Sequence, residues 1–202
     1  MDVKSPKAER SEATRAQLLA VARRLFGERG YADVGTEEIV RAAGVTRGAL
    51  YHHFESKREL LAAVYEQVES ELTEWIATEA FSGEDVPNDP LEALHRGAEL
   101  FLDACLEPEV QRIVLLDAPS VLGWDRWREV ASRFGLGLIQ ASLQSAIDAG
   151  SIPAQPVRPL AHVLMGALDE AAMLVARADD DGATRAEVGE TLSRLIDALA
   201  AR

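Results

Sequence analysis

Apolar residues recur along most of this chain at spacings of three and four, the pattern of amphipathic helices. The first such segment runs from about Ser11 to Glu28. A second, short segment begins at Thr36, ahead of two acidic residues, and ends at Gly44. A third begins at Thr46, whose hydroxyl is expected to cap it. The N-terminal part therefore predicts one long helix followed by two short ones.

The rest of the chain predicts longer helices separated by turn signals. Ser56 with Glu59, and Thr184 with Glu187, match the capping box, and Asp89 precedes a proline at a first helical position. Further helices are expected to begin at Ser56, Asp89, near Gln111, near Trp124, near Pro159 and near Thr184. We expect an all-α fold of about nine helices.

Charge divides the chain into two unequal parts. The net charge is −13, yet residues 1–58 hold 11 Lys or Arg against 8 Asp or Glu, which gives +3. Residues 59–202 hold the remaining 10 and 26, which gives −16. Binding a polyanion requires Lys and Arg to neutralise phosphates, so the N-terminal part is where nucleic acid is expected to bind.

No segment approaches the ~18 uninterrupted apolar residues that span a bilayer, and the start lacks the apolar stretch of a secretory signal. We therefore expect a cytoplasmic, nucleoid-associated protein with no membrane partner. Cys105 is the single cysteine and permits no intrachain disulfide. A buried, hydrophobic role is expected for it.

Two short helices joined by a tight Gly-containing turn, after a longer helix, form a helix-turn-helix, whose second helix enters the major groove of DNA. Here that helix starts at Thr46, with Leu50 and Phe54 facing inward at a spacing of four. On its outward side Arg47 can pair with guanine, and Gly48 permits close approach to the bases. Tyr51, His53 and Lys57 can donate to phosphates. Alternatively, the aromatic and histidine side chains are ordinary helix-surface residues.

A resemblance to the TetR family of bacterial transcriptional regulators is carried by the segment TEEIVRAAGVTRGALYHHFESKREL. It is close over about residues 11–60, and the rest is similar only in helix count and order. The resemblance implies a helix-turn-helix DNA-binding domain with an N-terminal arm over residues 1–57, and a ligand-sensing and dimerisation domain over residues 58–202. The expected DNA-binding residues are Thr36, Glu37, Thr46, Arg47, Gly48, Ala49, Tyr51, His52, His53 and Lys57.

Two features near this segment have open interpretations. Glu37 brings negative charge close to the DNA; it either reads a cytosine amine or favours the helix N-terminus. Lys4, Lys7 and Arg10 either reach a minor groove, as arms in the family sometimes do, or form a solvated tail.

The resemblance also implies that the last two helices pair with their copies in a second subunit, giving a homodimer. The expected interface residues are Leu160, Val163, Leu164, Ala167, Leu168, Ala171, Leu174, Val188, Leu192, Leu195, Ile196 and Leu199. The expected partners are double-stranded operator DNA, a second copy of the chain and an unidentified small-molecule effector. No cofactor and no metal are expected.

Family members generally keep a ligand cavity between the middle helices. The candidate lining residues here are His95, Phe101, Cys105, Arg112, Trp124, Trp127, Phe134 and Met165. Trp124 and Trp127 lie three residues apart, which places both rings on one helix face. Plain core packing is the alternative for each of these residues.

Two other classes of function fit the sequence less well. An enzyme is disfavoured because the sequence has no Gly-rich phosphate loop, no nucleophile elbow and no metal-ligand spacing. A helical protein-interaction module with a vestigial helix-turn-helix is disfavoured by the intact Arg47, Tyr51 and Lys57. The prediction is a non-enzymatic, ligand-released DNA-binding regulator, with repression favoured over activation.

Overall fold

A computed structural model of the protein describes residues 5–82 and 87–200, and within these ranges it contains helices and loops but no strand. The elements are α1 (Pro6–Arg29), α2 (Thr36–Ala42), α3 (Arg47–His53), α4 (Lys57–Phe81), α5 (Pro90–Ala104), α6 (Pro108–Val110), the π-helix η1 (Gln111–Asp117), α7 (Ala118–Leu122), α8 (Trp124–Asp148), α9 (Val157–Ala176) and α10 (Asp181–Ala200). Counting α6, η1 and α7 as one segment, the described residues form nine helices, so the all-α expectation is confirmed.

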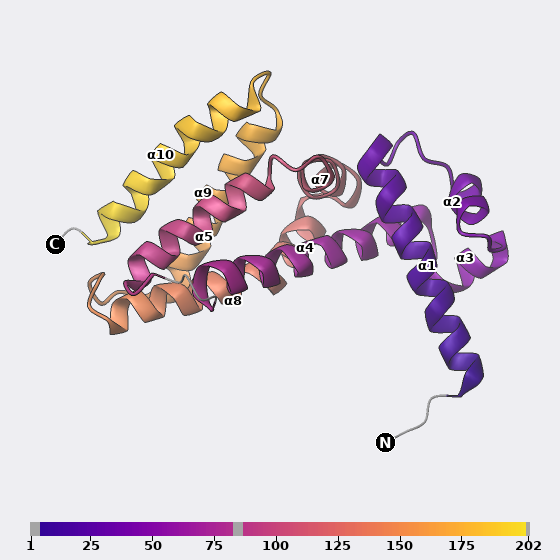
Figure 1. Ribbon diagram of the computed structural model, residues 1–202, viewed down its shortest axis with the longest axis horizontal. Helices are drawn as coiled ribbons and strands as arrows, with labels where there is room; N and C mark the ends of the chain where they lie inside the picture. Colours follow the sequence, from indigo (N-terminus) through magenta and orange to yellow (C-terminus); the bar gives the residue numbers. More distant parts are fainter. Residues whose placement is uncertain (1–4, 83–86, 201–202) are drawn as a thin grey trace.

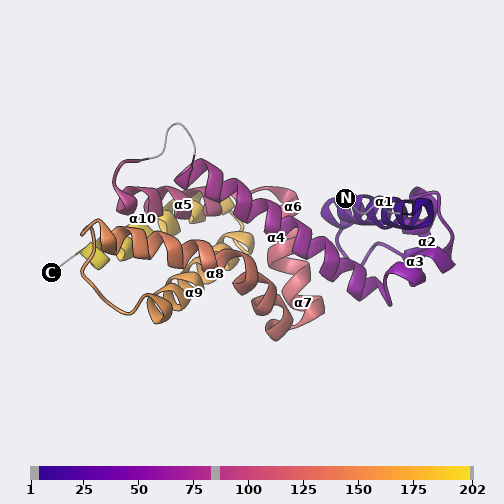
Figure 2. The same ribbon diagram turned by 90° about the horizontal axis from the view of Figure 1, so that it is seen from below.

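The molecule is elongated, with two groups of helices joined by α4. Figure 1 shows α1, α2 and α3 together at one end and α5, α9 and α10 at the other, and the turned view in Figure 2 agrees. Helix α4 contacts α1 near its N-terminus and α5 and α8 further along, so one continuous helix belongs to both groups. A displacement of α4 therefore moves residues in both groups of helices.

Side-chain caps fix several helix starts where the sequence predicts them. The Thr46 hydroxyl accepts a hydrogen bond from the Ala49 amide at 3.2 Å, and α3 follows directly. At α5 the Asp89 carboxylate accepts from the Leu91 amide at 2.9 Å, and Pro90 occupies the first helical position. Both predicted caps are confirmed.

Two helices begin earlier than predicted because a different residue caps them. Helix α1 starts at Pro6 and not at Ser11, since the Ser5 hydroxyl accepts from the Ala8 amide at 3.3 Å. Helix α10 starts at Asp181 and not at Thr184, since the carboxylate of the preceding residue accepts from an amide three positions on. At α1 a proline occupies the first helical position, and at α10 the cap precedes the capping box of Thr184 and Glu187 by one turn.

The earlier start of α1 changes the interpretation of the basic N-terminus. Lys4 lies outside the described residues. Arg10 lies within α1, and so does the backbone of Lys7, so neither belongs to an extended arm.

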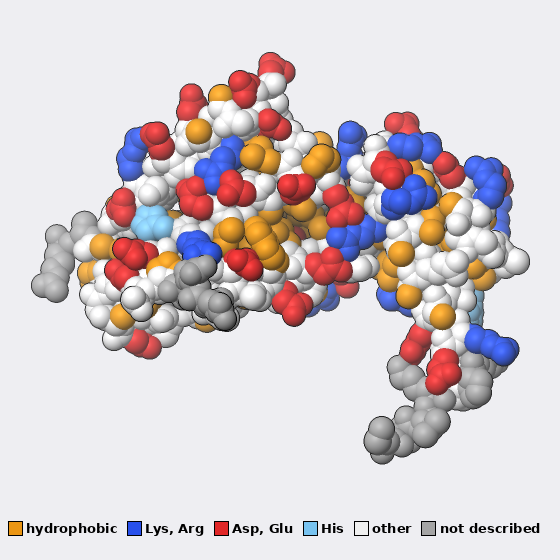
Figure 3. All heavy atoms as spheres, in the orientation of Figure 1, with side chains coloured by type: hydrophobic (Ala, Val, Ile, Leu, Met, Phe, Trp, Pro, Cys, Tyr) orange, Lys and Arg blue, Asp and Glu red, His pale blue; other side chains and the backbone are white. Residues whose placement is uncertain are grey.

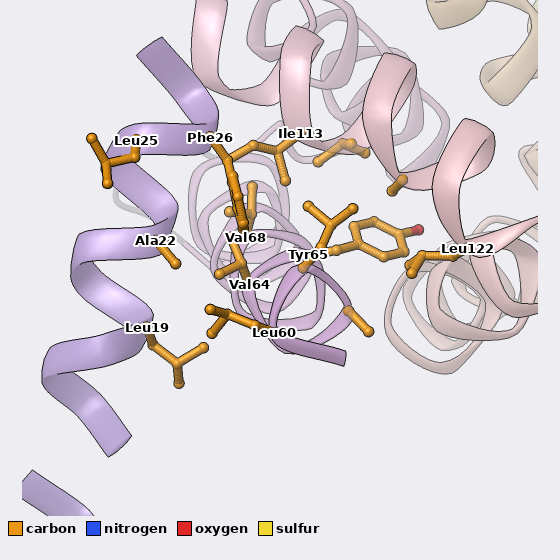
Figure 4. Packing of buried hydrophobic residues seen from close by; sticks show 14 of the residues in the cluster. Leu19, Ala22, Leu25, Phe26, Leu60, Val64, Tyr65, Val68, Ile113 and Leu122 are labelled. Atoms are coloured by element: carbon orange, nitrogen blue, oxygen red, sulfur yellow. The ribbon is translucent and has the colours of Figure 1, made fainter. Parts of the chain in front are cut away.

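A single apolar cluster joins the two groups of helices. We call it the shared core; it contains Leu18, Ala22, Leu25 and Phe26 from α1, Leu60, Leu61, Val64, Tyr65 and Val68 from α4, and Ile113, Val114, Leu115 and Leu122 from η1 and α7. Figure 4 shows the α1 and α4 side chains meeting those of Ile113 and Leu122. A second cluster, which includes Leu94, Leu143 and Leu164, packs α5, α8, α9 and α10 together.

The predicted helical piece around Gln111 is present, but it is a π-helix. The Ala118 amide donates to the Ile113 carbonyl, five residues back, so the next donor in this pattern would be Pro119. Proline has no N–H, and the Val114 carbonyl is left without a helical partner. The indole nitrogen of Trp127 donates to that carbonyl at 2.9 Å. A side chain from α8 thus completes the irregular turn.

Among the described residues, one helix, α9, is long and apolar enough to cross a membrane by length and composition alone. Core helices of soluble proteins meet the same criterion, and α9 packs against α8, α10, α5 and η1.

Replacing Trp127 with Phe tests the role of the indole in the π-helix. The Val114 carbonyl would remain buried without a donor, so the free energy of unfolding is expected to fall by about 1–3 kcal/mol. Urea denaturation followed by circular dichroism measures this. Trp124→Phe is the matched control, because Trp124 is 63% exposed and its loss should change stability by less than about 0.5 kcal/mol. Equal effects of the two replacements would contradict the assignment.

Candidate functional site

The outward side of α3 is an exposed polar surface that α2 extends. Leu50 and Phe54 are buried against α1 and α4, as predicted, and this fixes the rotation of α3. The exposed side chains and backbone left outside belong to Glu37, Thr46, Arg47, Gly48, Tyr51 and His52, and the half-buried Thr36 borders them; we call these residues the α3 face. In Figure 3, Lys and Arg side chains gather over the α1–α3 end of the visible face.

The polar groups of the α3 face contact one another across α2 and α3. Arg47 lies 3.7 Å from the Glu37 carboxylate, and its guanidinium carbon lies 5.5 Å from the centre of the Tyr51 ring. Hydrogen bonds from Thr36 and then from Arg47 lower the pKa of the Tyr51 phenol. Thr36 is the first residue of α2, with Gly35 at the cap position, so its hydroxyl is free for this contact. Arg47 thus lies beside both Glu37 and Tyr51.

The two other predicted DNA-binding residues of α3 are less exposed. Ala49 is half-buried, as is His53, whose ring lies beside His52 and Phe54. Burial, followed by the positive charges of His52 and Arg15, lowers the pKa of His53. His53 is therefore held toward its neutral form, which leaves it one N–H to donate.

The Lys57 ammonium lies inside the loop between α1 and α2. It donates to the Tyr31 carbonyl at 2.8 Å and to the Val34 carbonyl at 2.9 Å, and it lies 3.9 Å from the centre of the Tyr31 ring. Burial lowers the pKa of Lys57, and the carboxylate of Asp117 partly opposes this. Since an ammonium has three N–H donors, two are used within the loop and one is left. The main structural role of Lys57 is therefore to stabilise the loop between α1 and α2.

Polar contacts accompany the shared core at the junction between the two groups of helices. The Arg58 guanidinium donates to the carbonyls of Val121 and Leu122, at 3.1 and 2.7 Å. The guanidinium of Arg23 on α1 binds both carboxylate oxygens of Glu109, at 2.9 and 2.7 Å. Because these bonds join α1 and α4 to the segment from α6 to α7, a shift of that segment would carry the α3 face with it.

One further bond of this kind corrects an expectation about polar ligand contacts. The Asp117 carboxylate accepts from the Tyr31 amide at 2.7 Å, and a side chain at Gly30 would meet Arg112 at 3.2 Å. Arg112, a predicted lining residue, therefore lies with Asp117 at the α1–α2 loop and not at the cavity described below, because η1 directs both side chains toward α1.

The outward faces of α9 and α10 expose several large apolar side chains. Val163 is 69% exposed, Leu174 53% and Leu195 51%. Five further expected interface residues are half-buried: Leu160, Ala167, Leu168, Val188 and Leu199. Leu164, Ala171, Leu192 and Ile196 are buried within the chain against its own helices, so they are unavailable to a partner and that expectation is corrected. An amphipathic pattern does not distinguish the face of a helix that meets its own chain from one that meets a second chain.

A mostly apolar cavity of about 80 Å³ lies between α4, α5, α8 and α9. Its walls include Leu72 and Ile76 from α4, Phe101 from α5, Leu138 from α8, and Met165 and Leu168 from α9. Of the eight residues predicted to line a ligand cavity, Phe101 and Met165 border this cavity. Within the described residues, no group of three or more His, Cys, Asp or Glu is placed to hold a metal ion.

The other predicted lining residues lie elsewhere, and each has a packing reason. Cys105 and Trp127 are buried in the shared core, against which Phe134 packs, and burial raises the pKa of the Cys105 thiol. Trp124 lies on the surface. His95 contacts α10, where its ring nitrogens lie 2.9 Å from an Asp197 oxygen and 3.3 Å from the Ser193 hydroxyl. These residues therefore lie in packing or surface positions and do not border the cavity.

One acidic residue at the cavity was missed by the sequence analysis. Glu69 borders the cavity from α4 and is only 8% exposed. Burial raises the pKa of its carboxyl to about 7. Its position in the sequence could have identified it. Glu69 precedes the buried Leu72 and Ile76 by three and seven residues, so a charged residue lies on the apolar face of the helix.

The geometry of the α3 face, mounted on α1 and joined to a larger helical group, defines a helix-turn-helix DNA-binding protein. Two family models match the chain: "Bacterial regulatory proteins, tetR family" over residues 18–64, and "Tetracyclin repressor-like, C-terminal domain" over residues 91–199. The chain therefore belongs to the TetR family of DNA-binding transcriptional regulators.

Individual proteins agree with this assignment. The structure is similar to that of a TetR-family transcriptional regulator from Pectobacterium atrosepticum, with 36% sequence identity, a TM-score of 0.85, and coverage of 98% of this chain and 99% of that one. The sequence is 30% identical to the transposon Tn10 TetC protein of Escherichia coli over 166 residues, 82% of each chain. The structure of RolR in complex with resorcinol shares the fold, with a TM-score of 0.71 at 21% identity over 96% of each chain.

Replacing Glu69 with Gln tests its burial through the pH dependence of stability. Between the ordinary pKa of 4.5 and about 7, the folded protein holds a proton at Glu69 that the unfolded chain has lost. The free energy of unfolding therefore falls as the pH rises through this range, by on the order of 3 kcal/mol from this group. The variant lacks this loss and should gain stability over the unaltered protein as the pH rises.

Urea denaturation at a series of pH values measures the difference. Glu74→Gln, on an exposed part of the same helix, is the matched control and should follow the unaltered protein at every pH. Parallel curves for the unaltered protein and Glu69→Gln would show that the carboxyl is not buried in solution.

Proposed function

We propose that this chain is a homodimeric transcriptional repressor that binds a palindromic operator through the α3 face and is released by a small molecule. Residues 1–57 would form the DNA-binding domain and residues 58–202 the sensing and dimerisation domain, with the protein acting in the cytoplasm. The observation that carries the proposal is the exposed α3 face, whose arginine, glycine and tyrosine stand clear of the shared core.

The chemistry of the α3 face suits the major groove. A guanidinium such as that of Arg47 can donate two hydrogen bonds to the O6 and N7 atoms of guanine. A Cβ at Gly48 would meet only the Thr46 hydroxyl within 4 Å, so a DNA base can approach the α3 backbone there. Glu37, which lies 3.7 Å from Arg47, would either give up that contact when Arg47 binds a guanine or itself accept a hydrogen bond from a cytosine amine.

Contacts to the DNA backbone would surround this reading position. Thr36, Thr46, Tyr51, His52 and His53 carry hydroxyl or ring N–H donors for phosphates, and Ala49 would contact a thymine methyl. Lys57 would use its remaining N–H for a phosphate while it holds the α1–α2 loop. Its replacement would therefore weaken binding to every duplex and also loosen the domain.

The exposed apolar side chains of α9 and α10 support a dimer formed by these two helices. Burying a side chain such as Leu174 or Leu195 at an interface stabilises the assembly by about 1.5–3 kcal/mol. Two copies related by a two-fold axis would place their α3 helices about one DNA turn, ~34 Å, apart. This spacing requires an operator with two inverted half-sites.

Release by a small molecule is supported by the cavity and by its place along α4. RolR, which shares this fold, was solved with the ligand resorcinol. In the present chain the cavity is bordered by α4, and the shared core joins the N-terminal part of α4 to α1. A ligand that spreads the cavity walls would move α4 and favour a state in which the two α3 helices no longer match successive grooves.

Replacing Arg47 with Ala tests base reading. Affinity for the operator should fall by about 1–3 kcal/mol, and the preference at one base pair of each half-site should relax, because a bidentate contact is lost. Fluorescence anisotropy titrations measure this with duplexes from upstream of the chain's own gene, each carrying a single base-pair change.

Arg194→Ala is the control for the Arg47 experiment, since Arg194 is an exposed arginine on α10 that, among the described residues, pairs with Glu190 of its own helix. Its replacement should leave DNA binding unchanged. If Arg47→Ala weakened random duplexes as much as the operator, Arg47 would be a backbone contact and the reading role would be excluded.

Replacing Leu195 with Glu tests the interface. A charge at this exposed apolar position should dissociate the dimer, so sedimentation equilibrium should give half the mass and operator affinity should fall. Trp75→Glu, a comparably exposed apolar side chain on α4, should leave the dimer intact. A monomeric unaltered protein that still binds the operator would rule out the dimer.

A further inference from the structure

Glu69 is a charged side chain at the cavity without a partner. Within residues 5–82 and 87–200 its carboxylate makes no hydrogen bond and no ion pair, although the residue is only 8% exposed. No side-chain oxygen in this part of the chain is both fully enclosed and unpaired, so the Glu69 oxygens retain some free surface. Because Glu69 borders the cavity, that surface is where a ligand can reach it.

The other polar groups at the cavity make its electrostatic sign clear. The second acidic residue, Asp169, is paired with Arg128. The Ser142 hydroxyl donates to the Leu138 carbonyl at 2.8 Å, so its hydrogen is already used. None of the described lining residues is Lys, Arg or His. The cavity thus offers an unpaired carboxylate within apolar walls, which disfavours an anionic ligand.

We propose that the effector is a small monocationic amine with an apolar body, whose ammonium group binds Glu69 while the body occupies the apolar cavity. This proposal rests on the proposed function, because it names the chemical class of the molecule that releases the regulator. It makes Glu69 the specificity-determining residue of the sensing domain.

The energetics of a buried carboxylate favour this partner. An isolated charge in an apolar site is costly, and the raised pKa of Glu69 expresses that cost. An ammonium group supplies both an opposite charge and N–H donors, and charge-assisted hydrogen bonds are about twice as strong as neutral ones. A neutral alcohol of the same shape supplies only a hydroxyl, so it should bind more weakly.

The size of the cavity links binding to release. An engineered cavity of about 150 Å³ in another protein binds benzene, and the cavity here is about 80 Å³. An amine with an aromatic or branched body must therefore widen it. The lining residues of α4, Leu72, Thr73 and Ile76 as well as Glu69, would be pushed directly.

Matched pairs of probes test the proposal: benzylamine with benzyl alcohol, and phenylbutylamine with phenylbutanol. Isothermal titration calorimetry above the pKa of Glu69 should show at least one amine binding about tenfold or more tightly than its alcohol. In Glu69→Gln this preference should fall to near unity, and Glu74→Gln, altered at an exposed position on the same helix, should keep it. Failure of both amines to bind, or equal binding of amine and alcohol, would overturn the proposal even if no variant folds.

A gel shift with the operator separates this proposal from the proposed function. An amine that binds selectively and reduces operator binding supports both. Selective binding without loss of operator affinity keeps the amine site but removes ligand release from the proposed function. If the protein binds the operator but shows no preference for amines, the proposed regulatory function is retained and the proposed role of Glu69 is overturned.

Discussion

The packing of α1 and α4 against η1 and α7 is the constraint on which the rest of the molecule depends. The side chains that meet there, including Phe26, Tyr65 and Ile113, are fully buried, and each such side chain stabilises the fold by about 1.5–3 kcal/mol. Close-packed interiors transmit displacement because they have few voids to absorb it. The DNA-binding helices are therefore fixed to the sensing helices and are not suspended from a flexible linker.

Irregular features of the fold lie close to this junction. The π-helix η1 leaves a carbonyl that Trp127 satisfies from another helix, and α4 carries the buried Glu69 two helical turns beyond Leu61. Such features cost stability locally and persist where the surroundings compensate for them. Here a side chain compensates for the first, whereas no side chain in the described residues compensates for the second. For this reason we interpret the π-helix as a structural irregularity and Glu69 as part of a binding site.

How much the sequence predicts depends on whether the contacts are local. The cap at Thr46 follows from its residue type, and the inward pair Leu50 and Phe54 follows from a spacing of four; both local predictions are confirmed. The residues assigned to DNA binding on the outward side rest on the family resemblance as well. The position of Lys57 inside the α1–α2 loop depends on a contact across 26 residues, which no local pattern encodes. The cavity is more difficult to predict from the sequence. Four helices with similar apolar faces form its walls, and the spacing of apolar residues does not indicate which of these faces pack against one another.

The separation of charge has a consequence for how the molecule meets DNA. Residues 1–58, which contain the α3 face, carry +3 and residues 59–202 carry −16, and Figure 1 shows α1, α2 and α3 at one end of an elongated molecule. The chain is therefore a strong electric dipole. Near a duplex the acidic part is repelled and the N-terminal part attracted, which favours encounters in which α3 faces the DNA. Dissolved salt shortens the range of this effect to about 8 Å at physiological ionic strength.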